Sequence, residues 1–249
     1  MNEENNLVTL KPFSMLDIKK SPFIVGVLNP KYFDDELIYL KKNLPGIIEY
    51  RADLNDVINI DIIKSHLKII SGELALPLLF TLRDKSEGGS FLGTDEQRHE
   101  IYSRALEFVD AIDIESSLAE PACEIIKSAI SKNILVILSY HNFDKTPENI
   151  SLKKIIDSCF ERGADITKIA TMCDTKEEAE QLISLTLKYN NIAVVGMGKY
   201  GRVTRITAPS FGSVFTYAFT DNKKSLIPGQ LTVEELKMAW ELAGIIGNR

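Results

Sequence analysis

Cysteine is scarce in this sequence, and the three that occur are Cys123, Cys159 and Cys173. Their number is odd, their spacing is wide and none belongs to a CxxC pair, which argues against a disulfide framework and against a cysteine-ligated zinc site. We therefore expect three reduced thiols. No other group of residues has metal-site spacing, so we predict no metal.

Long apolar runs are also missing from the sequence. No segment reaches the roughly 20 apolar residues that a membrane-spanning helix needs. Residues 1–6 are polar and acidic, whereas a secretory signal begins with basic residues and continues with apolar ones. We therefore expect a cytoplasmic protein that does not enter a membrane.

Basic residues do not outnumber acidic ones, since the net charge is −6 and the pI is near 5.3. This balance argues against a nucleic-acid or anionic-membrane surface, which would need clustered basic residues. A small anionic substrate remains compatible with it, because a few arginines in a pocket can oppose the overall charge.

The chain of 249 residues, 45% of them hydrophobic, is long enough to bury a full core. No Gly/Ser linker, composition shift or internal repeat divides it. We therefore predict a single domain over residues 1–249, in which residues 8–18 form an N-terminal extension, a short hairpin that closes the barrel floor.

Short runs rich in β-branched residues recur along the chain and predict strands. They cover residues 23–28, 47–51, 78–82, 109–114, 134–138, 166–170, 192–195 and 213–217. Stretches with helical periodicity lie between them. The clearest of these cover residues 95–108, 121–132, 151–162, 175–189 and 232–246.

Strands that alternate with helices indicate a parallel sheet with crossover helices, and eight such units in about 250 residues fit a (β/α)8 barrel. Two helix starts carry capping signals. Thr94 precedes Asp-Glu-Gln, and Thr232 precedes Val-Glu-Glu in a capping-box pattern. The predicted fold class is therefore α/β, a TIM barrel.

Lys168 stands in the middle of an apolar run that predicts a buried strand. Lysine is rarely buried unless it is paired or used, and a desolvated lysine becomes an amine nucleophile more readily. His141 follows the preceding strand, and its ordinary pKa of about 6.5 suits proton transfer near neutrality. Either residue alone has a structural interpretation, a lysine whose charge reaches solvent or a structural histidine. Together they indicate a Schiff-base enzyme.

Charged residues collect at the carboxyl ends of the predicted strands, where barrel enzymes place their chemistry. Glu49 and Arg51 alternate along one strand, so both point into the barrel. Asp113 and Glu115 close another strand, and we interpret these two as ion-pair partners. Arginine offers bidentate donors that suit a carboxylate or several hydroxyls. Three arginines reach this end of the barrel: Arg51, Arg83 and Arg205.

One motif, taken alone, indicates a different kind of site. Residues 196–201 match GxGxxG, the dinucleotide-binding pattern, directly after a predicted strand. That pattern should open a long helix in an early βαβ unit, but here Pro209 follows soon after. We therefore interpret these glycines as a turn that delivers Arg205, and we expect no nicotinamide cofactor.

The ordered set of strand-end residues resembles one family, the type I 3-dehydroquinate dehydratases of the shikimate pathway. No single stretch is very specific, but together they cover nearly the whole chain in the family's order. The matching stretches are Glu49-Tyr-Arg-Ala-Asp53, Leu79-Phe-Thr-Leu-Arg83 with Glu87-Gly-Gly89, Ser139-Tyr-His-Asn-Phe143, Lys168-Ile-Ala170, Thr204-Arg-Ile206 with Phe211-Gly-Ser213, and Pro228-Gly-Gln230.

The resemblance implies a cytoplasmic, cofactor-free lyase, usually a homodimer, that dehydrates 3-dehydroquinate to 3-dehydroshikimate on the route to chorismate and the aromatic amino acids. Lys168 would form an imine with the substrate ketone, His141 would move the protons of a syn-elimination, and Glu87 would orient His141. The resemblance also implies a set of substrate-binding residues: Glu49, Arg51, Arg83, Arg205, Gln230 and, less firmly, Ser225.

Two positions depart from the family pattern. A serine that often contacts substrate from the first strand is replaced by Gly26. A second serine, four residues before the glutamine in many members, is Leu226 here, with Ser225 one place earlier. Both departures put a peripheral hydrogen bond in doubt and leave the chemistry unaffected.

Two other functions compete with this one. Another Schiff-base barrel, such as an aldolase, could share the lysine strand, but it would not need His141, Glu87 and three arginines. A barrel that only binds metabolites would have no evident reason to place a lysine and a histidine on adjacent strands. Borohydride trapping with 3-dehydroquinate separates these possibilities.

Overall fold

The structure, a computed structural model, describes residues 22–220 and 229–246. Every predicted strand is present, and several continue for a few residues beyond the apolar run that predicted them. The strands are β1 (Phe23–Leu28), β2 (Ile47–Arg51), β3 (Leu78–Thr81), β4 (Ala111–Glu115), β5 (Leu135–Asn142), β6 (Ile166–Met172), β7 (Ile192–Met197) and β8 (Phe215–Phe219).

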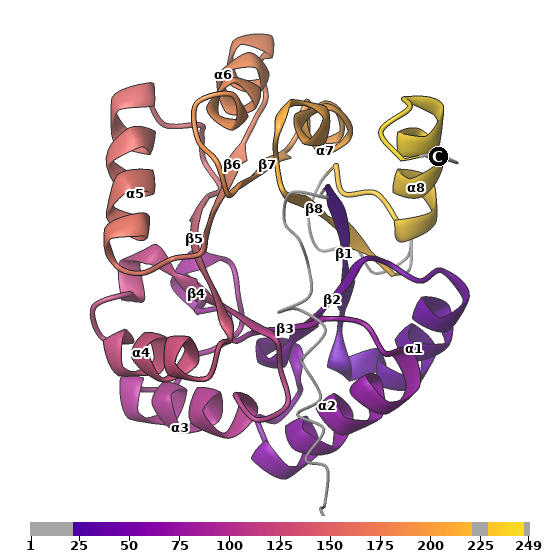
Figure 1. Cartoon of the computed structure of the whole chain (residues 1–249), viewed down its shortest axis with the longest axis vertical. Coiled ribbons are helices and arrows are strands. Elements are labelled where there is room, and N and C mark those ends of the chain that lie inside the picture. Colours follow the sequence, from indigo (N-terminus) through magenta and orange to yellow (C-terminus); the bar gives the residue numbers. More distant parts are fainter. Residues whose placement is uncertain (1–21, 221–228, 247–249) are drawn as a thin grey trace, which may run out of the picture.

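The strands form one parallel sheet in the order β7-β6-β5-β4-β3-β2-β1-β8. β1 pairs with both β2 and β8, so the sheet curls back toward its start. The two outer strands meet near their base, where the Val214 amide donates to the Ile192 carbonyl at 2.9 Å. Figure 1 shows the strands around a common centre with the helices outside them. The predicted (β/α)8 barrel is therefore confirmed.

The five helices predicted from periodicity are present, and the structure describes three more, α1, α2 and α7. In chain order the helices are α1 (Phe33–Lys42), α2 (Ile60–Leu74), α3 (Asp95–Ala105), α4 (Cys123–Ser131), α5 (Asn149–Glu161), α6 (Lys176–Thr186), α7 (Gly201–Thr207) and α8 (Val233–Leu242). Both predicted caps are capping boxes, at Thr94 with Gln97 and at Thr232 with Glu235.

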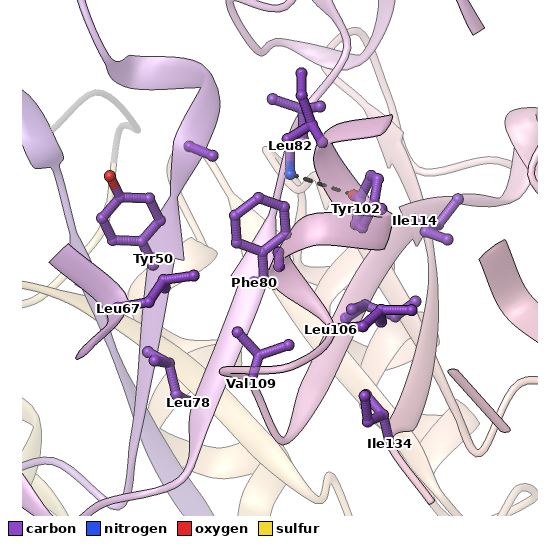
Figure 2. Close-up of a cluster of buried hydrophobic side chains, with 14 of the residues drawn as sticks. Tyr50, Leu67, Leu78, Phe80, Leu82, Tyr102, Leu106, Val109, Ile114 and Ile134 are labelled. Atoms are coloured by element: carbon purple, nitrogen blue, oxygen red, sulfur yellow. Dashed lines mark hydrogen bonds between the residues drawn. The ribbon is translucent and has the colours of Figure 1, made fainter. Parts of the chain in front are cut away.

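Each strand is buried on both faces, as a barrel strand must be. The inward face is apolar at its base, where residues from several strands form one cluster, among them Val25, Ile47, Leu79, Ala111 and Ile137. The outward faces pack against the helices. Figure 2 shows part of the largest outer cluster, in which Phe80 lies between Tyr50 and Tyr102, with ring centroids 6.2 and 5.3 Å away.

Tyr102 connects this outer core to the strands. Its hydroxyl donates to the Asp113 carbonyl at 2.7 Å and accepts from the Leu82 amide at 3.3 Å. The ends of β3 and β4 are therefore held from outside as well as by their own ladder. These are the strands that carry Arg83 and Asp113 toward the barrel mouth.

The remaining predictions about the chain have mixed outcomes. All three cysteines are free thiols, as expected. The N-terminal hairpin predicted at residues 8–18 lies outside the described residues. Among the helices that the structure describes, none is long and apolar enough to cross a membrane.

Candidate active site

A pocket opens at the carboxyl ends of the strands, inside the barrel. Eight of the nine predicted site residues line it: Glu49, Arg51, Arg83, Glu87, His141, Lys168, Arg205 and Gln230. The ninth, Ser225, lies outside the described residues. These eight come from six different segments of the chain and meet only because the sheet closes on itself.

Strand alternation explains why these side chains face the pocket. Along β6, Ile166 and Ala170 belong to the inner apolar cluster, so Lys168 between them points inward as well. The same alternation brings Glu49 and Arg51 inward from β2, as predicted. The barrel interior is therefore apolar at its base and polar at its mouth.

Lys168 is buried, with 6% of its surface exposed, and its ammonium lies 3.1 Å from Asp113 Oδ2. Burial lowers the pKa of Lys168 from its ordinary value, and the nearby Arg83 guanidinium adds to that effect. Asp113 acts in the opposite direction without cancelling it. A lysine in this position can lose its proton more easily than one in solvent.

His141 and Glu87 form a pair at the same pocket. Glu87 belongs to the short 3-10 helix η5 (Lys85–Glu87) after β3, and its Oε2 lies 2.9 Å from His141 Nδ1. The same oxygen accepts the His141 backbone amide at 3.1 Å, and Oε1 accepts the Ser117 hydroxyl at 2.7 Å. The carboxylate therefore fixes the imidazole ring and leaves Nε2 as the ring nitrogen that is not paired with Glu87.

Burial lowers the pKa of His141 well below its ordinary value, and the charges of Arg83, Lys168 and Arg51 add to that shift. Burial also raises the pKa of Glu87. At neutral pH the imidazole is therefore neutral, which is the form that accepts a proton. Its titration lies below the neutral range that its ordinary pKa suggested.

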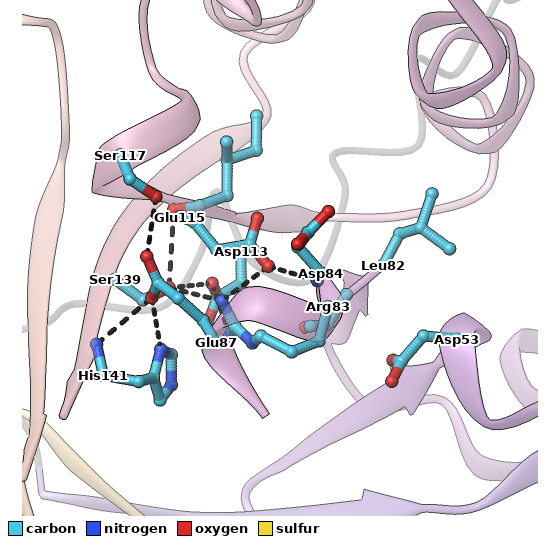
Figure 3. Close-up of polar contacts among 12 residues, drawn as sticks. Asp53, Leu82, Arg83, Asp84, Glu87, Asp113, Glu115, Ser117, Ser139 and His141 are labelled. Carbon is cyan, nitrogen blue, oxygen red and sulfur yellow. Dashed lines mark hydrogen bonds and ion pairs between the residues drawn. The ribbon is translucent and has the colours of Figure 1, made fainter. Parts of the chain in front are cut away.

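Arg83 is tied into a buried network, shown in Figure 3. Its guanidinium donates to Ser139 Oγ at 2.7 Å and to Asp113 Oδ1 at 2.8 Å, and it lies 3.1 Å from Glu115. Burial opposes the charge of Arg83, but the two carboxylates outweigh it and raise its pKa well above the ordinary value. The predicted ion-pair role of Asp113 and Glu115 is confirmed.

Asp113 does more than pair with Arg83. It receives hydrogen bonds from Arg83, from the Ser139 hydroxyl at 2.6 Å and from Lys168. Burial alone would raise its pKa, but the two neighbouring cations lower it to about 2. Asp113 is therefore a carboxylate throughout the neutral range, and it links the arginine network to the lysine.

Arg51 also has a carboxylate partner. Its Nε and one terminal nitrogen donate to the two oxygens of Asp53, both at 2.8 Å. Glu49 accepts the Thr81 hydroxyl at 2.7 Å and is 2% exposed. These contacts hold both side chains at the pocket wall, where each retains polar atoms for a ligand.

Arg205 differs from the other two arginines. It lies on α7 and is 1% exposed, and one terminal nitrogen donates to the Tyr217 carbonyl at 2.9 Å. Its Nε and other terminal nitrogen have no partner among the described residues. Burial without a carboxylate lowers the pKa of Arg205 to about 10. A buried guanidinium with two open donors is suited to an anionic ligand.

The comparisons with known proteins agree with this geometry. The sequence profile described as type I 3-dehydroquinase matches residues 29–246. The chain belongs to the type I 3-dehydroquinase family. It is 36% identical over 227 residues to a 3-dehydroquinate dehydratase of Methanococcoides burtonii, covering 91% of this chain and 96% of that protein. It is 32% identical over 235 residues to that of Methanosarcina barkeri, covering 91% and 97%.

Solved structures of the family share the fold. The type I 3-dehydroquinate dehydratase of Clostridium difficile, solved with covalently modified comenic acid, matches with a TM-score of 0.82 and 29% identity, covering 89% of this chain and 92% of that one. The 3-dehydroquinate dehydratase of Geobacillus kaustophilus matches with a TM-score of 0.80 and 25% identity, covering 92% and 93%. The predicted resemblance is therefore confirmed.

The assignment of Gly26 to the position of the family's substrate-contacting serine is wrong. A side chain at Gly26 would point out of the barrel, because its Cβ would lie 2.9 Å from Pro45 Cγ and 3.0 Å from Leu40 Cδ2. The β1 residue that lines the pocket is the next one, Val27. Adjacent strand residues face opposite sides, so a shift of one residue in the comparison exchanges the two faces.

The GxGxxG match also has a structural explanation. Gly198, at φ 75°, makes the turn after β7, and α7 begins three residues later and carries Arg205. A Cβ at Gly196 would lie 2.4 Å from Thr204 Oγ1, the hydroxyl that accepts the Gly196 amide at 3.0 Å. The glycines therefore allow a tight strand-to-helix turn, as predicted for this member of the 3-dehydroquinase family.

Sequence reasoning missed two aromatic side chains at the site, Tyr217 and Phe219. Tyr217, on β8, lines the pocket, and its ring centroid lies 4.2 Å from Lys168 Nζ. The signal was present, since strand alternation places it on the same face as Phe215 and Phe219. Within residues 22–220 and 229–246, no three His, Cys, Asp or Glu side chains are grouped to hold a metal ion.

Proposed function

We propose that this chain is a 3-dehydroquinate dehydratase, a lyase that converts 3-dehydroquinate to 3-dehydroshikimate and water through an imine on Lys168. The observation that carries the proposal is the burial of Lys168 in the same pocket as the His141–Glu87 pair. Its near relatives carry the same activity in their names.

The first step of this mechanism uses the lowered pKa of Lys168. The neutral amine adds to the substrate ketone, and loss of water leaves a protonated imine. That cation draws electrons from the adjacent carbon, so a C–H bond next to it becomes acidic. The barrel supplies this electron sink without a cofactor.

The second step uses His141. The neutral imidazole, oriented by Glu87, removes the proton from the adjacent carbon and then returns it to the departing hydroxyl. One base that later acts as an acid is sufficient, because the proton removed from carbon is the one that the leaving oxygen needs. Hydrolysis of the imine then frees Lys168.

The substrate carboxylate would bind Arg205, which is buried and has two open donors. Gln230 lines the same pocket and would take a neighbouring polar group. Glu49, Arg51 and Arg83 would hold the ring hydroxyls from their positions at the wall. A homodimer in the cytoplasm, serving the shikimate pathway toward chorismate and the aromatic amino acids, remains the expectation.

Borohydride trapping tests the proposal directly. With 3-dehydroquinate and borohydride, we expect loss of activity and a ligand-sized mass increment on the peptide that contains Lys168. The assay contains excess chelator and no added nucleotide, and we expect activity to be unaffected by either condition.

The matched control is Lys176→Arg, at an exposed lysine on α6, which should trap like the native chain. An unmodified Lys168 under turnover conditions would contradict the imine mechanism. Activity that returns only on addition of a metal ion or NAD would contradict the cofactor-free site.

A further inference from the structure

The ring of Tyr217 covers the reactive nitrogen of the pocket. Lys168 Nζ lies 4.2 Å from the ring centroid, within the distance at which a cation is attracted to an aromatic face. The two side chains are 4% and 6% exposed. They stand on strands β8 and β6, so the contact joins two rigid elements.

Neighbouring groups hold the Tyr217 ring in place. Phe215, two residues earlier on the same face of β8, packs edge-to-face against it at 5.7 Å. The Tyr217 carbonyl accepts a hydrogen bond from Arg205 at 2.9 Å. The ring is therefore fixed between the arginine that would bind the substrate carboxylate and the lysine that would bind its ketone.

A positive charge at Lys168 Nζ has few groups to stabilise it. The carboxylate of Asp113, 3.1 Å away, is its hydrogen-bonded partner, while burial opposes the charge. The other charged or titratable groups that act on Lys168 from the neighbouring elements are Arg83, Glu49 and His141. Arg83 repels a cation at Lys168 and Glu49 attracts it. The face of the Tyr217 ring, 4.2 Å from Nζ, adds a further source of negative potential.

We propose that the face of the Tyr217 ring is a positioning element that stabilises the cationic nitrogen of Lys168, both as the resting ammonium and as the protonated imine. This inference rests on the proposed imine chemistry. In that step the amine nitrogen bonds to the ketone carbon, one proton is consumed, and the ketone oxygen leaves as water. The product is a C=N bond whose positive charge stays at the same nitrogen, beside the same ring face.

The ring, and not the hydroxyl, is the group that this role requires. The Tyr217 hydroxyl has no partner among the described residues, and burial raises its pKa well above the ordinary value. It therefore stays neutral and offers no charge to the lysine. A phenylalanine at this position would keep the ring face, whereas an aliphatic side chain would remove it.

The test compares rings of the same shape and different charge distribution. Tyr217→Phe keeps the electron-rich face, pentafluorophenylalanine in place of Tyr217 reverses its electrostatic sign, and Tyr217→Leu removes it. Phe33→Leu is the matched control, because it removes a buried ring on α1 that packs against His66 and does not line the pocket. Near-ultraviolet circular dichroism shows which variants keep the native fold.

Two measurements are made on each folded variant. The pH dependence of reductive methylation of Lys168, read by peptide mass spectrometry, gives the pKa of its amine without any substrate. Borohydride trapping at a fixed concentration of 3-dehydroquinate gives the population of protonated imine. The first readout does not depend on the proposed function, so the two proposals can fail separately.

We expect Tyr217→Phe and Phe33→Leu to behave like the native chain. The pentafluorophenylalanine and Tyr217→Leu variants should have a lower pKa at Lys168 and a roughly 2- to 30-fold smaller population of trapped imine, the range that a cation–π contact spans from exposed to desolvated sites. If only the leucine variant fails to fold, the fluorinated ring still decides the question.

Native-like pKa and trapping in the pentafluorophenylalanine variant would overturn the proposal, as would an equal loss in Phe33→Leu, which would indicate that the loss of any buried ring has the same effect. A loss in Tyr217→Phe equal to that in Tyr217→Leu would assign the effect to the hydroxyl and contradict the role of the ring face. Native protein that traps no imine, with a Lys168 pKa that still depends on the ring, would contradict the proposed function alone.

Discussion

At the scale of single residues, replacing His141 should separate substrate binding and imine formation from proton transfer. His141→Ala should keep the fold and still allow Lys168 to reach the ketone, because the imidazole is hydrogen-bonded to Glu87 and Lys168 to Asp113. Elimination should slow by about 10²–10⁴-fold, the usual contribution of a positioned general base. Covalent adduct should then accumulate, and intact-protein mass spectrometry of the variant with substrate would detect it without reduction.

The control for this variant is His99→Ala, at an exposed histidine on α3, which should turn over normally. Near-native turnover of His141→Ala would show that another group is the base. A folded variant that forms no adduct would show that His141 is also needed to make the imine.

Replacing Arg205 should weaken substrate binding and raise the stability of the fold. Arg205→Met removes a buried charge that has no carboxylate partner. We expect KM to rise roughly 10- to 150-fold, from the loss of a charge-assisted hydrogen bond worth about 1.5–3 kcal/mol. The free energy of unfolding should rise by about 1–2 kcal/mol, because well-packed apolar side chains are often more stable than buried charges.

Steady-state kinetics and urea unfolding of Arg205→Met check both parts. Arg202→Met, at an exposed arginine on the same helix, should change neither quantity. A native KM would move the carboxylate site elsewhere, and a lower stability would show that the guanidinium holds α7 in place through Tyr217.

At the scale of elements, the segment that contains η5, after β3, depends on the glycine at position 89. A Cβ at Gly89 would lie 2.1 Å from the Arg83 carbonyl oxygen, a backbone atom that cannot move aside cheaply. Gly89→Ala should therefore displace the segment that carries Glu87, which lowers kcat because Glu87 no longer orients His141. The kcat pH profile and urea unfolding would measure these effects.

Gly72 is the matched glycine for this experiment. It lies in α2, and nothing would come within 4 Å of an added Cβ. Gly72→Ala should raise the free energy of unfolding by about 0.5–1 kcal/mol, the difference in helix propensity, with kcat unchanged. Equal effects from the two alanines would contradict a specific backbone constraint at Gly89.

Strand and helix positions could be predicted to different extents from the sequence. The strands of a barrel are buried on both faces, so their apolar runs are continuous and easy to find. α2 also carried a signal, with Asn59 as its N-cap and Ile63, Leu67, Ile70 and Leu74 buried at helical spacing. α7 carried almost none, because seven residues are too few for periodicity to show.

Most residues of the site could be predicted from the sequence, but most of their charge partners and pKa shifts could not. Alternation along β2 placed Glu49 and Arg51 correctly from the sequence alone. The difference between Arg83 and Arg205 could not be predicted, because the partners of Arg83 stand 30 and 56 residues further along the chain. The same limit applies to the ring of Tyr217 above Lys168, which depends on the closure of the sheet.

At the scale of the whole molecule, the buried titratable groups predict how stability depends on pH. The pKa of His141 is lowered well below its unfolded value, and burial also lowers that of His66. Below about pH 6.5 the unfolded chain binds these protons and the folded chain does not, so the free energy of unfolding should fall as the pH drops through that value.

A second loss should follow at lower pH. Asp113 has a pKa of about 2 in the folded chain, below the ordinary value of about 3.9, so its contribution is lost as the pH falls from about 4 toward 2. Urea unfolding at about pH 7.5, 5.5, 4 and 2.5 checks the two windows. His141→Gln should reduce the pH dependence in the first window, leaving the part due to His66, and should not change the second. An unchanged slope between pH 6.5 and 5 would contradict the buried neutral imidazole.

Because the sheet curls back on itself, its closure also determines whether the protein keeps its activity when the chain is cut. The pocket takes Glu49 from β2, early in the chain, and Gln230 from the segment that follows β8, and the two come together only where β1 pairs with both β2 and β8. Half a barrel would keep several hydrogen-bonded strand pairs and still lack one wall of the pocket. Proteolytic nicking that frees either half should therefore abolish activity in one step, with no partly active fragment along the way.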